Sequence, residues 1–119
     1  MRIMIADDQA KVRFALRILL EQRPSWHVVG EVGDADTLLQ QIDDVHPDLL
    51  LLDWKLPAHS PALFLQQLRA ICPQLMVVAI SGRPECYQEA MRGGADAFVS
   101  KIDPPERLLT VLDDCVQHK

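Results

Sequence analysis

The chain of 119 residues has the size of one ordinary domain, and we expect residues 1–119 to form a single unit. Its net charge of −5 and its scattered basic residues disfavour direct binding to nucleic acid, and no apolar run is long enough to span a bilayer. The three cysteines are widely spaced and form no CxxC pair, which argues against a disulfide framework or a zinc site. We therefore expect a soluble, cytoplasmic protein.

Apolar runs typical of strands alternate along the chain with apolar stripes of helical period. Residues 2–6 are the first such run, and the stripe that follows them predicts a helix that Pro24 bars from continuing. Residues 26–32 are rich in β-forming types but mixed in polarity, which favours a strand nearer the sheet edge. Asp34 can cap the next helix, and Pro47 closes it.

Four consecutive leucines at residues 49–52 are the centre of the predicted sheet. A short strand that is apolar on both faces is typical of a central parallel strand, and Asp53 would end it. Ser60 then offers an N-cap for a helix that Pro73 stops. Residues 75–80 are another run typical of a buried strand.

The last part of the chain contains two further predicted helices with one strand between them. Residues 85–92 hold a short, weakly patterned helix, which Gly93-Gly94 ends. Residues 95–99 indicate a fifth strand, and Asp103 lies at the start of the final helix. The stripe expected to be buried on that helix is Leu108, Val111, Leu112, Cys115 and Val116.

The alternation of strands and helices predicts an α/β fold, with a parallel five-stranded sheet between two helix layers in an αβα arrangement. Of the common doubly wound orders, the flavodoxin-like order 2-1-3-4-5 suits five strands. This order places the first and third strands side by side, so that Asp7 and Asp8 would meet Asp53. It also places Ser81 and Lys101 along the same rim of the sheet.

Three carboxylates at one rim repel one another, so they must hold a proton or bind a cation. Oxygen ligands without paired His or Cys favour Mg²⁺, and a carboxylate beside Mg²⁺ can attack a phosphoryl group. Asp53 would be the nucleophile, Lys101 would pair first with it and then with phosphoryl oxygens, and the Ser81 hydroxyl would bind one such oxygen. Each residue alone has an ordinary structural explanation, such as a cap, a turn or a solvated surface, but their joint placement does not.

This pattern resembles the receiver domain of two-component response regulators. The resemblance covers essentially the whole chain and is carried by Asp7-Asp8, Asp53 with Pro57 after it, Ser81-Gly82, Phe98 and Lys101. It implies that Asp53 is the phospho-acceptor and that Asp8 and Asp53 ligate Mg²⁺ directly. The backbone carbonyl of Lys55 would be a further ligand, and Asp7 would act through a water.

The resemblance also implies a switch and a means of tuning it. Ser81 and Phe98 would be the switch pair, changing the face formed by the fourth helix, the fifth strand and the fifth helix. Lys55 and Arg83 lie where the family tunes the lifetime of the acyl phosphate, and we expect two cations there to hinder the attacking water. The sequence departs from the family pattern at Phe98, where tyrosine is commoner, and at Ile102, where many members have proline.

Residues 28–32 and 47–50 look most like the NarL/FixJ/LuxR subgroup, whose full-length members end in a helix-turn-helix DNA-binding domain. The resemblance therefore implies a switch that a histidine kinase or phosphotransfer protein phosphorylates and that controls transcription through a domain outside this chain. It would be no enzyme beyond its own phosphotransfer and slow autodephosphorylation. Homodimers could form through the helix 4, strand 5 and helix 5 face or through helices 1 and 5, with no membrane or direct DNA contact.

Other functions stay open at this point. A stand-alone receiver would have the same sequence features, and so would an interaction module that keeps the fold without the chemistry. A Mg²⁺-dependent hydrolase with an aspartyl-phosphate intermediate is less favoured. Enzymes resembling the haloacid dehalogenase group carry an acid two residues after the nucleophile, and Lys55 occupies that position.

Overall fold

Five parallel strands form one sheet in the computed structural model, which describes residues 1–57 and 60–117. The order β2-β1-β3-β4-β5 confirms the order predicted from the sequence. The strands are β1 (Arg2–Ala6), β2 (His27–Val32), β3 (Leu49–Asp53), β4 (Met76–Ser81) and β5 (Ala97–Ser100). The carboxyl ends of all five strands therefore lie at one rim of the sheet.

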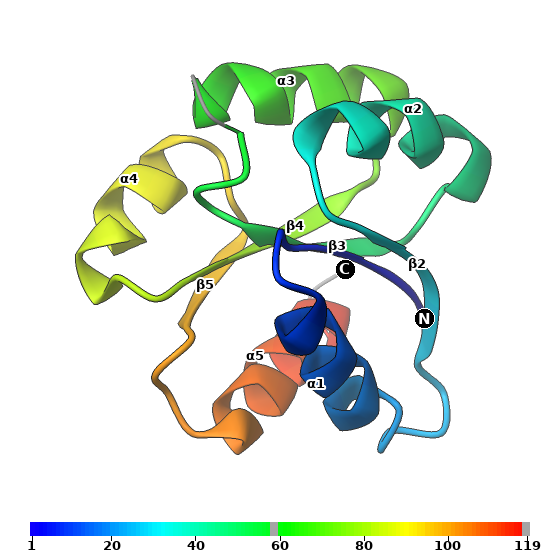
Figure 1. Cartoon of the computed structure of the whole chain (residues 1–119), viewed down its shortest axis with the longest axis vertical. Helices are drawn as coiled ribbons and strands as arrows, with labels where there is room; N and C mark the ends of the chain where they lie inside the picture. The colour runs from blue at the N-terminus through cyan, green and yellow to red at the C-terminus, as the bar shows by residue number, and fades with distance from the viewer. Residues whose placement is uncertain (58–59, 118–119) are drawn as a thin grey trace.

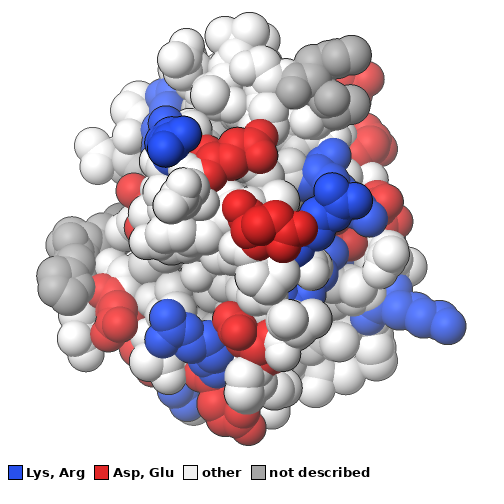
Figure 2. Space-filling model, turned by 90° about the vertical axis from the view of Figure 1, so that its left-hand side faces the viewer, with Lys and Arg blue, Asp and Glu red and all other residues white. Residues whose placement is uncertain are grey.

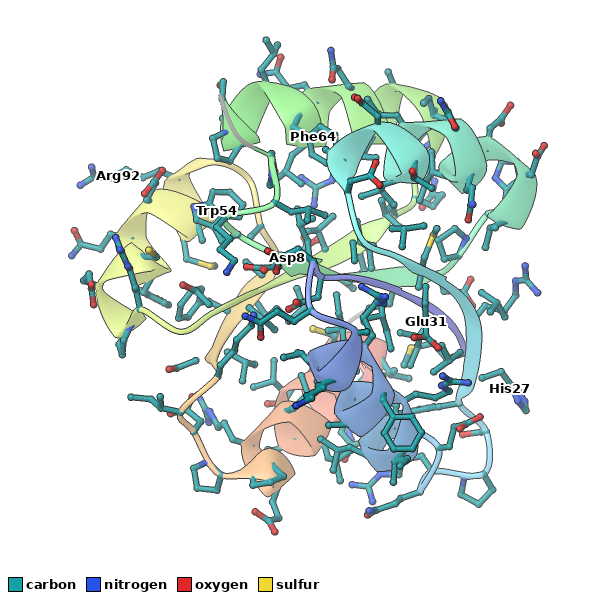
Figure 3. All side chains as sticks on the ribbon, viewed as in Figure 1. Asp8, His27, Glu31, Trp54, Phe64 and Arg92 are labelled. Atoms are coloured by element: carbon teal, nitrogen blue, oxygen red, sulfur yellow. The ribbon has the colours of Figure 1, made fainter. Side chains whose placement is uncertain are left out.

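Helices cover both faces of the sheet, as Figure 1 shows. One layer contains α2 (Ala35–Val45), α3 (Pro61–Ile71) and α4 (Tyr87–Arg92), and the other contains α1 (Ala10–Leu20) and α5 (Pro105–Gln117). Phe64 of α3 points toward the sheet, whereas His27 at the start of β2 points to solvent (Figure 3). None of the described helices is long and apolar enough to cross a membrane.

The leucine run explains why the sheet is covered on both faces. All five residues of β3 are buried, and alternate leucines enter opposite cores. Leu50 and Leu52 pack with α2 and α3, whereas Leu49 and Leu51 pack with α5. A central strand with two apolar faces needs helices on both sides, which is the arrangement observed.

Local signals set several helix ends as predicted. The Asp34 carboxylate accepts a hydrogen bond from the Thr37 N–H (2.8 Å), and the Ser60 hydroxyl oxygen accepts one from the Leu63 N–H (3.2 Å). At the other end of α2, His46 adopts a left-handed conformation with φ of 46° before Pro47.

Three differences from the sequence prediction concern α4, β5 and α5. The helix predicted at 85–92 is a 3₁₀ turn (Pro84–Cys86) followed by α4. The strand predicted at 95–99 begins only at Ala97, because Asp96 turns its carboxylate to the Val77 N–H (2.8 Å). Val116 belongs to the stripe of α5 predicted to be buried, but it is 43% exposed.

Candidate functional site

Three acids gather where β1 and β3 end side by side. Ala6 pairs with Leu52 in the sheet, so Asp7 and Asp53 follow at adjacent positions. Asp7 and Asp53 are buried, Asp8 is exposed, and one carboxylate oxygen from each lies within 4.8 Å of the others. The structure thus brings together the three acids that the sequence placed at this rim.

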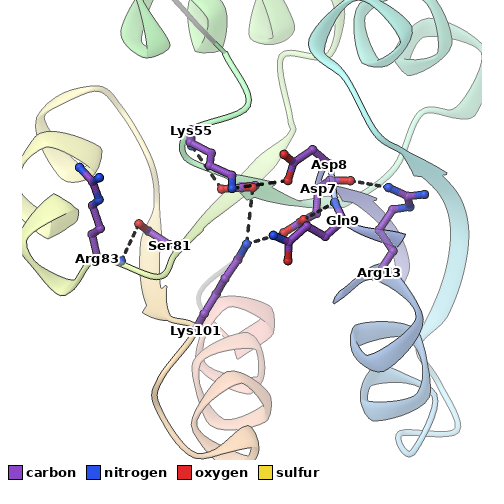
Figure 4. Close-up of polar contacts among 9 residues, drawn as sticks. Asp7, Asp8, Gln9, Arg13, Lys55, Ser81, Arg83 and Lys101 are labelled. Carbon is purple, nitrogen blue, oxygen red and sulfur yellow. Dashed lines mark hydrogen bonds and ion pairs between the residues drawn. The ribbon is translucent and has the colours of Figure 1, made fainter. Parts of the chain in front are cut away.

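Asp7 is held by groups from several segments (Figure 4). Its N–H donates to the Val32 carbonyl (3.1 Å), and its Oδ1 accepts from the Gln9 N–H (2.9 Å). Its Oδ2 lies 2.7 Å from Nζ of Lys101. Both carboxylate oxygens of Asp7 are therefore engaged within the protein.

The surroundings of Asp53 disfavour its negative charge. Its Oδ1 accepts a long hydrogen bond from the Lys55 N–H (3.3 Å), and its Oδ2 lies 3.5 Å from Nζ of Lys101. Burial raises the pKa of Asp53, the Lys101 charge opposes that rise, and the Asp7 charge adds to it. A cation placed beside Asp53 would offset this cost.

Lys101 follows β5 and faces two of the acids. Its N–H donates to the Ser81 carbonyl (2.7 Å), which fixes the start of its side chain between the ends of β4 and β5. Burial disfavours the charge on Lys101, but the hydrogen bond to Asp7 and the charge of Asp53 outweigh burial and raise its pKa. Lys101 is therefore a charged group at neutral pH.

The donor set fits a hard divalent cation. Lys101 pairs with the buried Oδ2 atoms of Asp7 and Asp53, and within residues 1–57 and 60–117 neither oxygen has a further hydrogen-bond partner. Mg²⁺ prefers oxygen ligands, which the three carboxylates supply, and the exposed side of Asp8 would let the ion keep several waters.

A hollow of about 700 Å³ borders this site, and its walls include Asp53, Ser81, Arg83 and Lys101. The Ser81 side chain is buried, and its hydroxyl oxygen accepts a hydrogen bond from the Arg83 N–H (3.0 Å). The Arg83 side chain is exposed at the same opening. Ser81, Arg83 and Lys101 thus surround the place above Asp53.

Phe98 lies apart from the acids, on β5 beside α4. Its ring packs edge-on against Tyr87, with the ring centroids 5.8 Å apart and the planes at 85°. Phe98 is partly buried and Tyr87 is 53% exposed, so this pair is at the surface of the α4 and β5 side. The predicted switch pair is therefore divided between the acidic site and the helix layer.

Sequence reasoning missed one residue that contacts this site, Arg13. The Arg13 guanidinium donates a hydrogen bond to the Asp7 carbonyl (2.6 Å), and no local pattern distinguishes it from other arginines on the helix. Trp54, next to Asp53, is buried beside α4 (Figure 3). A Cβ added at Gly93 would lie 3.0 Å from the Trp54 ring.

Comparisons with known proteins agree with this geometry. The model of the response regulator receiver domain matches residues 3–113. The phosphate regulon transcriptional regulatory protein PhoB of Klebsiella pneumoniae is 34% identical over 113 residues, covering 91% of this chain and 48% of PhoB. The nitrate/nitrite response regulator protein NarL of Escherichia coli K12 is 30% identical over 112 residues, covering 92% of this chain and 52% of NarL.

Among solved structures, the signal receiver domain of NarL from Mycobacterium tuberculosis superposes with a TM-score of 0.84 at 27% identity, covering 99% of this chain and 97% of that one. The chain spans about half the length of the curated relatives that it matches. The family match extends over nearly all of the sequence, and the predicted resemblance is confirmed. The chain belongs to the response regulator receiver domain family.

Proposed function

We propose that this chain is the phosphorylation-controlled switch of a two-component system, with Asp53 as its phospho-acceptor. The observation that carries this proposal is the position of Asp53, buried at the carboxyl end of β3 with one of its carboxylate oxygens within 4.8 Å of carboxylate oxygens of Asp7 and Asp8. The hollow beside it leaves room for a phosphoryl donor.

Asp8 and Asp53 would bind Mg²⁺ directly, together with the backbone carbonyl of Lys55. Asp7 would take part through a water, which agrees with the engagement of both its carboxylate oxygens by Gln9 and Lys101. A bound Mg²⁺ would neutralise charge on the oxygens of the transferring phosphoryl group.

In the transfer step, a carboxylate oxygen of Asp53 forms a bond to phosphorus while the phosphorus–nitrogen bond of the donor's phosphohistidine breaks. The electron pair of that bond stays on the imidazole of the donor. Lys101, 3.5 Å from Asp53, would then pair with phosphoryl oxygens, and the Ser81 hydroxyl would donate to one of them. Catalysis would be limited to this transfer and to slow autodephosphorylation.

Lys55 and Arg83 are the residues that we propose tune the lifetime of the acyl phosphate. Both side chains are exposed on the wall of the same hollow, where they can hinder an attacking water. Arg83→Ala is expected to speed the decay of the phosphorylated protein, measured by loss of the phosphoryl mass over time. An unchanged decay rate would remove Arg83 from this role.

The output would be a shift in population at the face of α4, β5 and α5. If the Ser81 hydroxyl binds the phosphoryl group, the loop after β4 must move, and Phe98 can turn inward only by leaving Tyr87. Figure 2 shows acidic and basic side chains interspersed with uncharged ones on the side that carries α4 and β5. Such a mixed surface suits a protein partner better than nucleic acid.

The partners follow from this switch. A histidine kinase or phosphotransfer protein would supply the phosphoryl group in the cytoplasm, and a DNA-binding domain outside this chain would read the switch. Support comes from PhoB and NarL, named as a transcriptional regulatory protein and a response regulator, of which this chain matches about half. Homodimers would use the α4, β5 and α5 face or the α1 and α5 face, where apolar residues line a groove of about 550 Å³.

Intact mass after incubation with acetyl phosphate tests the proposal. We expect one added phosphoryl group that requires Mg²⁺, is absent in Asp53→Asn, and persists in Asp36→Asn, a matched change at an exposed acid of α2. An adduct that survives Asp53→Asn would place the acceptor elsewhere. If the wild type shows no adduct, beryllofluoride binding would indicate a short-lived acyl phosphate, and no binding would contradict the proposal.

A further inference from the structure

We propose that Arg13 is a positioning residue that holds the backbone between β1 and α1 so that Asp7 and Asp8 face the metal site. This role rests on the proposed Mg²⁺ chemistry. It adds a residue outside the acidic cluster, on the second turn of α1.

The contact that carries this role is a hydrogen bond of 2.6 Å from the Arg13 guanidinium to the Asp7 carbonyl (Figure 4). The carbonyl of Asp7 and the N–H of Asp8 belong to one planar peptide unit. Fixing that oxygen therefore fixes the direction in which Asp8 leaves the strand. The other polar groups of Asp7 are held by Val32, Gln9 and Lys101. The hydrogen bond from the Gln9 N–H closes a turn around the Asp7–Asp8 peptide, and the Arg13 guanidinium binds the carbonyl oxygen of that peptide directly.

Arg13 is itself held in place from two sides. Its Nε lies 3.8 Å from the Glu31 carboxylate, whose other oxygen pairs with Nε of Arg17 at 2.8 Å. Figure 3 shows Glu31 between β2 and α1. On the other side, a Cβ at Gly33 would lie 3.1 Å from the Arg13 guanidinium, so glycine leaves the space that this group occupies. Only 22% of the Arg13 side chain is exposed.

Two effects of Arg13 on metal binding have opposite signs. Its positive charge repels a cation at the acids, so simple electrostatics predicts tighter Mg²⁺ binding when Arg13 is neutralised. If Arg13 orients Asp8, its replacement should weaken Mg²⁺ binding instead. We expect orientation to dominate, because the guanidinium contacts the carbonyl rather than a carboxylate, and solvent and salt screen its charge at the exposed Asp8.

Arg13→Gln and Arg17→Gln separate these effects. Both remove one charge from the same helix and the same Glu31 partner, but only Arg13 contacts Asp7. Mg²⁺ is titrated against tryptophan fluorescence, since Trp54 adjoins Asp53. We expect Arg13→Gln to weaken Mg²⁺ binding by roughly tenfold, the low end for the loss of a group that orients a ligand, and Arg17→Gln not to weaken it. Phosphorylation of Arg17→Gln at saturating Mg²⁺ should be close to wild type.

Binding by Arg13→Gln that equals or exceeds that of the wild type would overturn the positioning role. A wild type that does not bind Mg²⁺ would contradict the metal site as well, so the two failures are distinct. Thermal unfolding of the metal-free variants shows whether the fold is kept.

Gly33→Ala provides a second test that keeps the charge and crowds the guanidinium. We expect it to weaken Mg²⁺ binding on its own and to have no further effect in the Arg13→Gln background. Unchanged Mg²⁺ affinity in Gly33→Ala would overturn the role of Arg13 even if Arg13→Gln did not fold. If Arg13→Gln folds, an equal loss of affinity in both backgrounds would overturn it as well.

Discussion

The Lys55 ammonium lies 3.7 Å from Oδ1 of Asp8, across the exposed side of the acidic site. Both side chains are largely solvated, with 61% and 48% exposed. Lys55 therefore occupies the neighbourhood of a carboxylate that a divalent cation would use. A side chain and a metal ion that share one carboxylate compete for it.

Lys55→Ala should tighten Mg²⁺ binding by roughly threefold, because an exposed ion pair of this kind is worth only a fraction of a kcal/mol to about 1 kcal/mol. The backbone carbonyl of residue 55 is unaffected by this change. Titration of tryptophan fluorescence measures the affinity. Lys55→Arg keeps the charge and should bind like the wild type, and weaker binding by Lys55→Ala would show that Lys55 assists the ion.

Asp53→Asn should stabilise the protein at pH 7 without divalent cations. Burial raises the pKa of Asp53 above its ordinary 3.8, so the folded state holds this proton more tightly than the unfolded state does. The free energy of unfolding therefore falls as pH rises above about 3.8 and stays lowered once Asp53 is ionised. We expect a gain on the order of 1 kcal/mol, as when other buried charges are replaced.

This gain should shrink as the pH is lowered through the raised pKa of Asp53, because the folded wild type then takes up the proton that removes the buried charge. Urea unfolding at several pH values measures it, with Asp36→Asn as the control at an exposed acid. An Asp53→Asn variant that is less stable than the wild type at pH 7 would contradict the prediction.

Lys101→Met should destabilise the metal-free protein by about 3 kcal/mol, because it leaves the buried carboxylates of Asp7 and Asp53 without their cation. The pKa of Lys101 is raised above 10.5, so its contribution is present throughout the neutral range and is lost only as pH rises through that higher value. Urea unfolding should show part of the loss restored by Mg²⁺. Lys11→Met, at an exposed position of α1, is the control, and equal stability of the two variants would refute the expectation.

Gly93→Ala should destabilise the protein by about 1–3 kcal/mol, the usual cost of overpacking a filled site. The added Cβ would lie 3.0 Å from the Trp54 ring and 3.2 Å from the Glu89 carbonyl oxygen. Gly82→Ala is the matched control, since nothing lies within 4 Å of a Cβ there. Thermal unfolding compares the two, and similar midpoints would mean that Trp54 can move away from α4.

Much of the fold could be predicted because its signals are local. The leucines of β3 and the caps at Asp34 and Ser60 depend on neighbours within a few residues. The start of β5 could not be predicted, because the Asp96 carboxylate pairs with the Arg69 guanidinium (2.7 Å), which is distant from it in the sequence. Val116 continues the apolar period of α5 but is 43% exposed, so periodicity alone misplaces it.

The acidic site was predictable to the level of which residues meet, because strand order alone decides which strand ends are adjacent. Which lysine pairs with which acid was not predictable. That Lys101 approaches Asp7 more closely than Asp53, and that Lys55 faces Asp8, depends on side-chain packing across separate loops. The same holds for the carbonyl contact of Arg13.

The hydrogen bond from the residue 83 N–H to the Ser81 hydroxyl has a consequence for how such a switch can diverge. The backbone supplies the donor, so every amino acid except proline can hold the serine in place. The side chain at position 83 is therefore free to change from one descendant protein to another. Evolution could reset the duration of the signal there without rebuilding the mechanism that reads it.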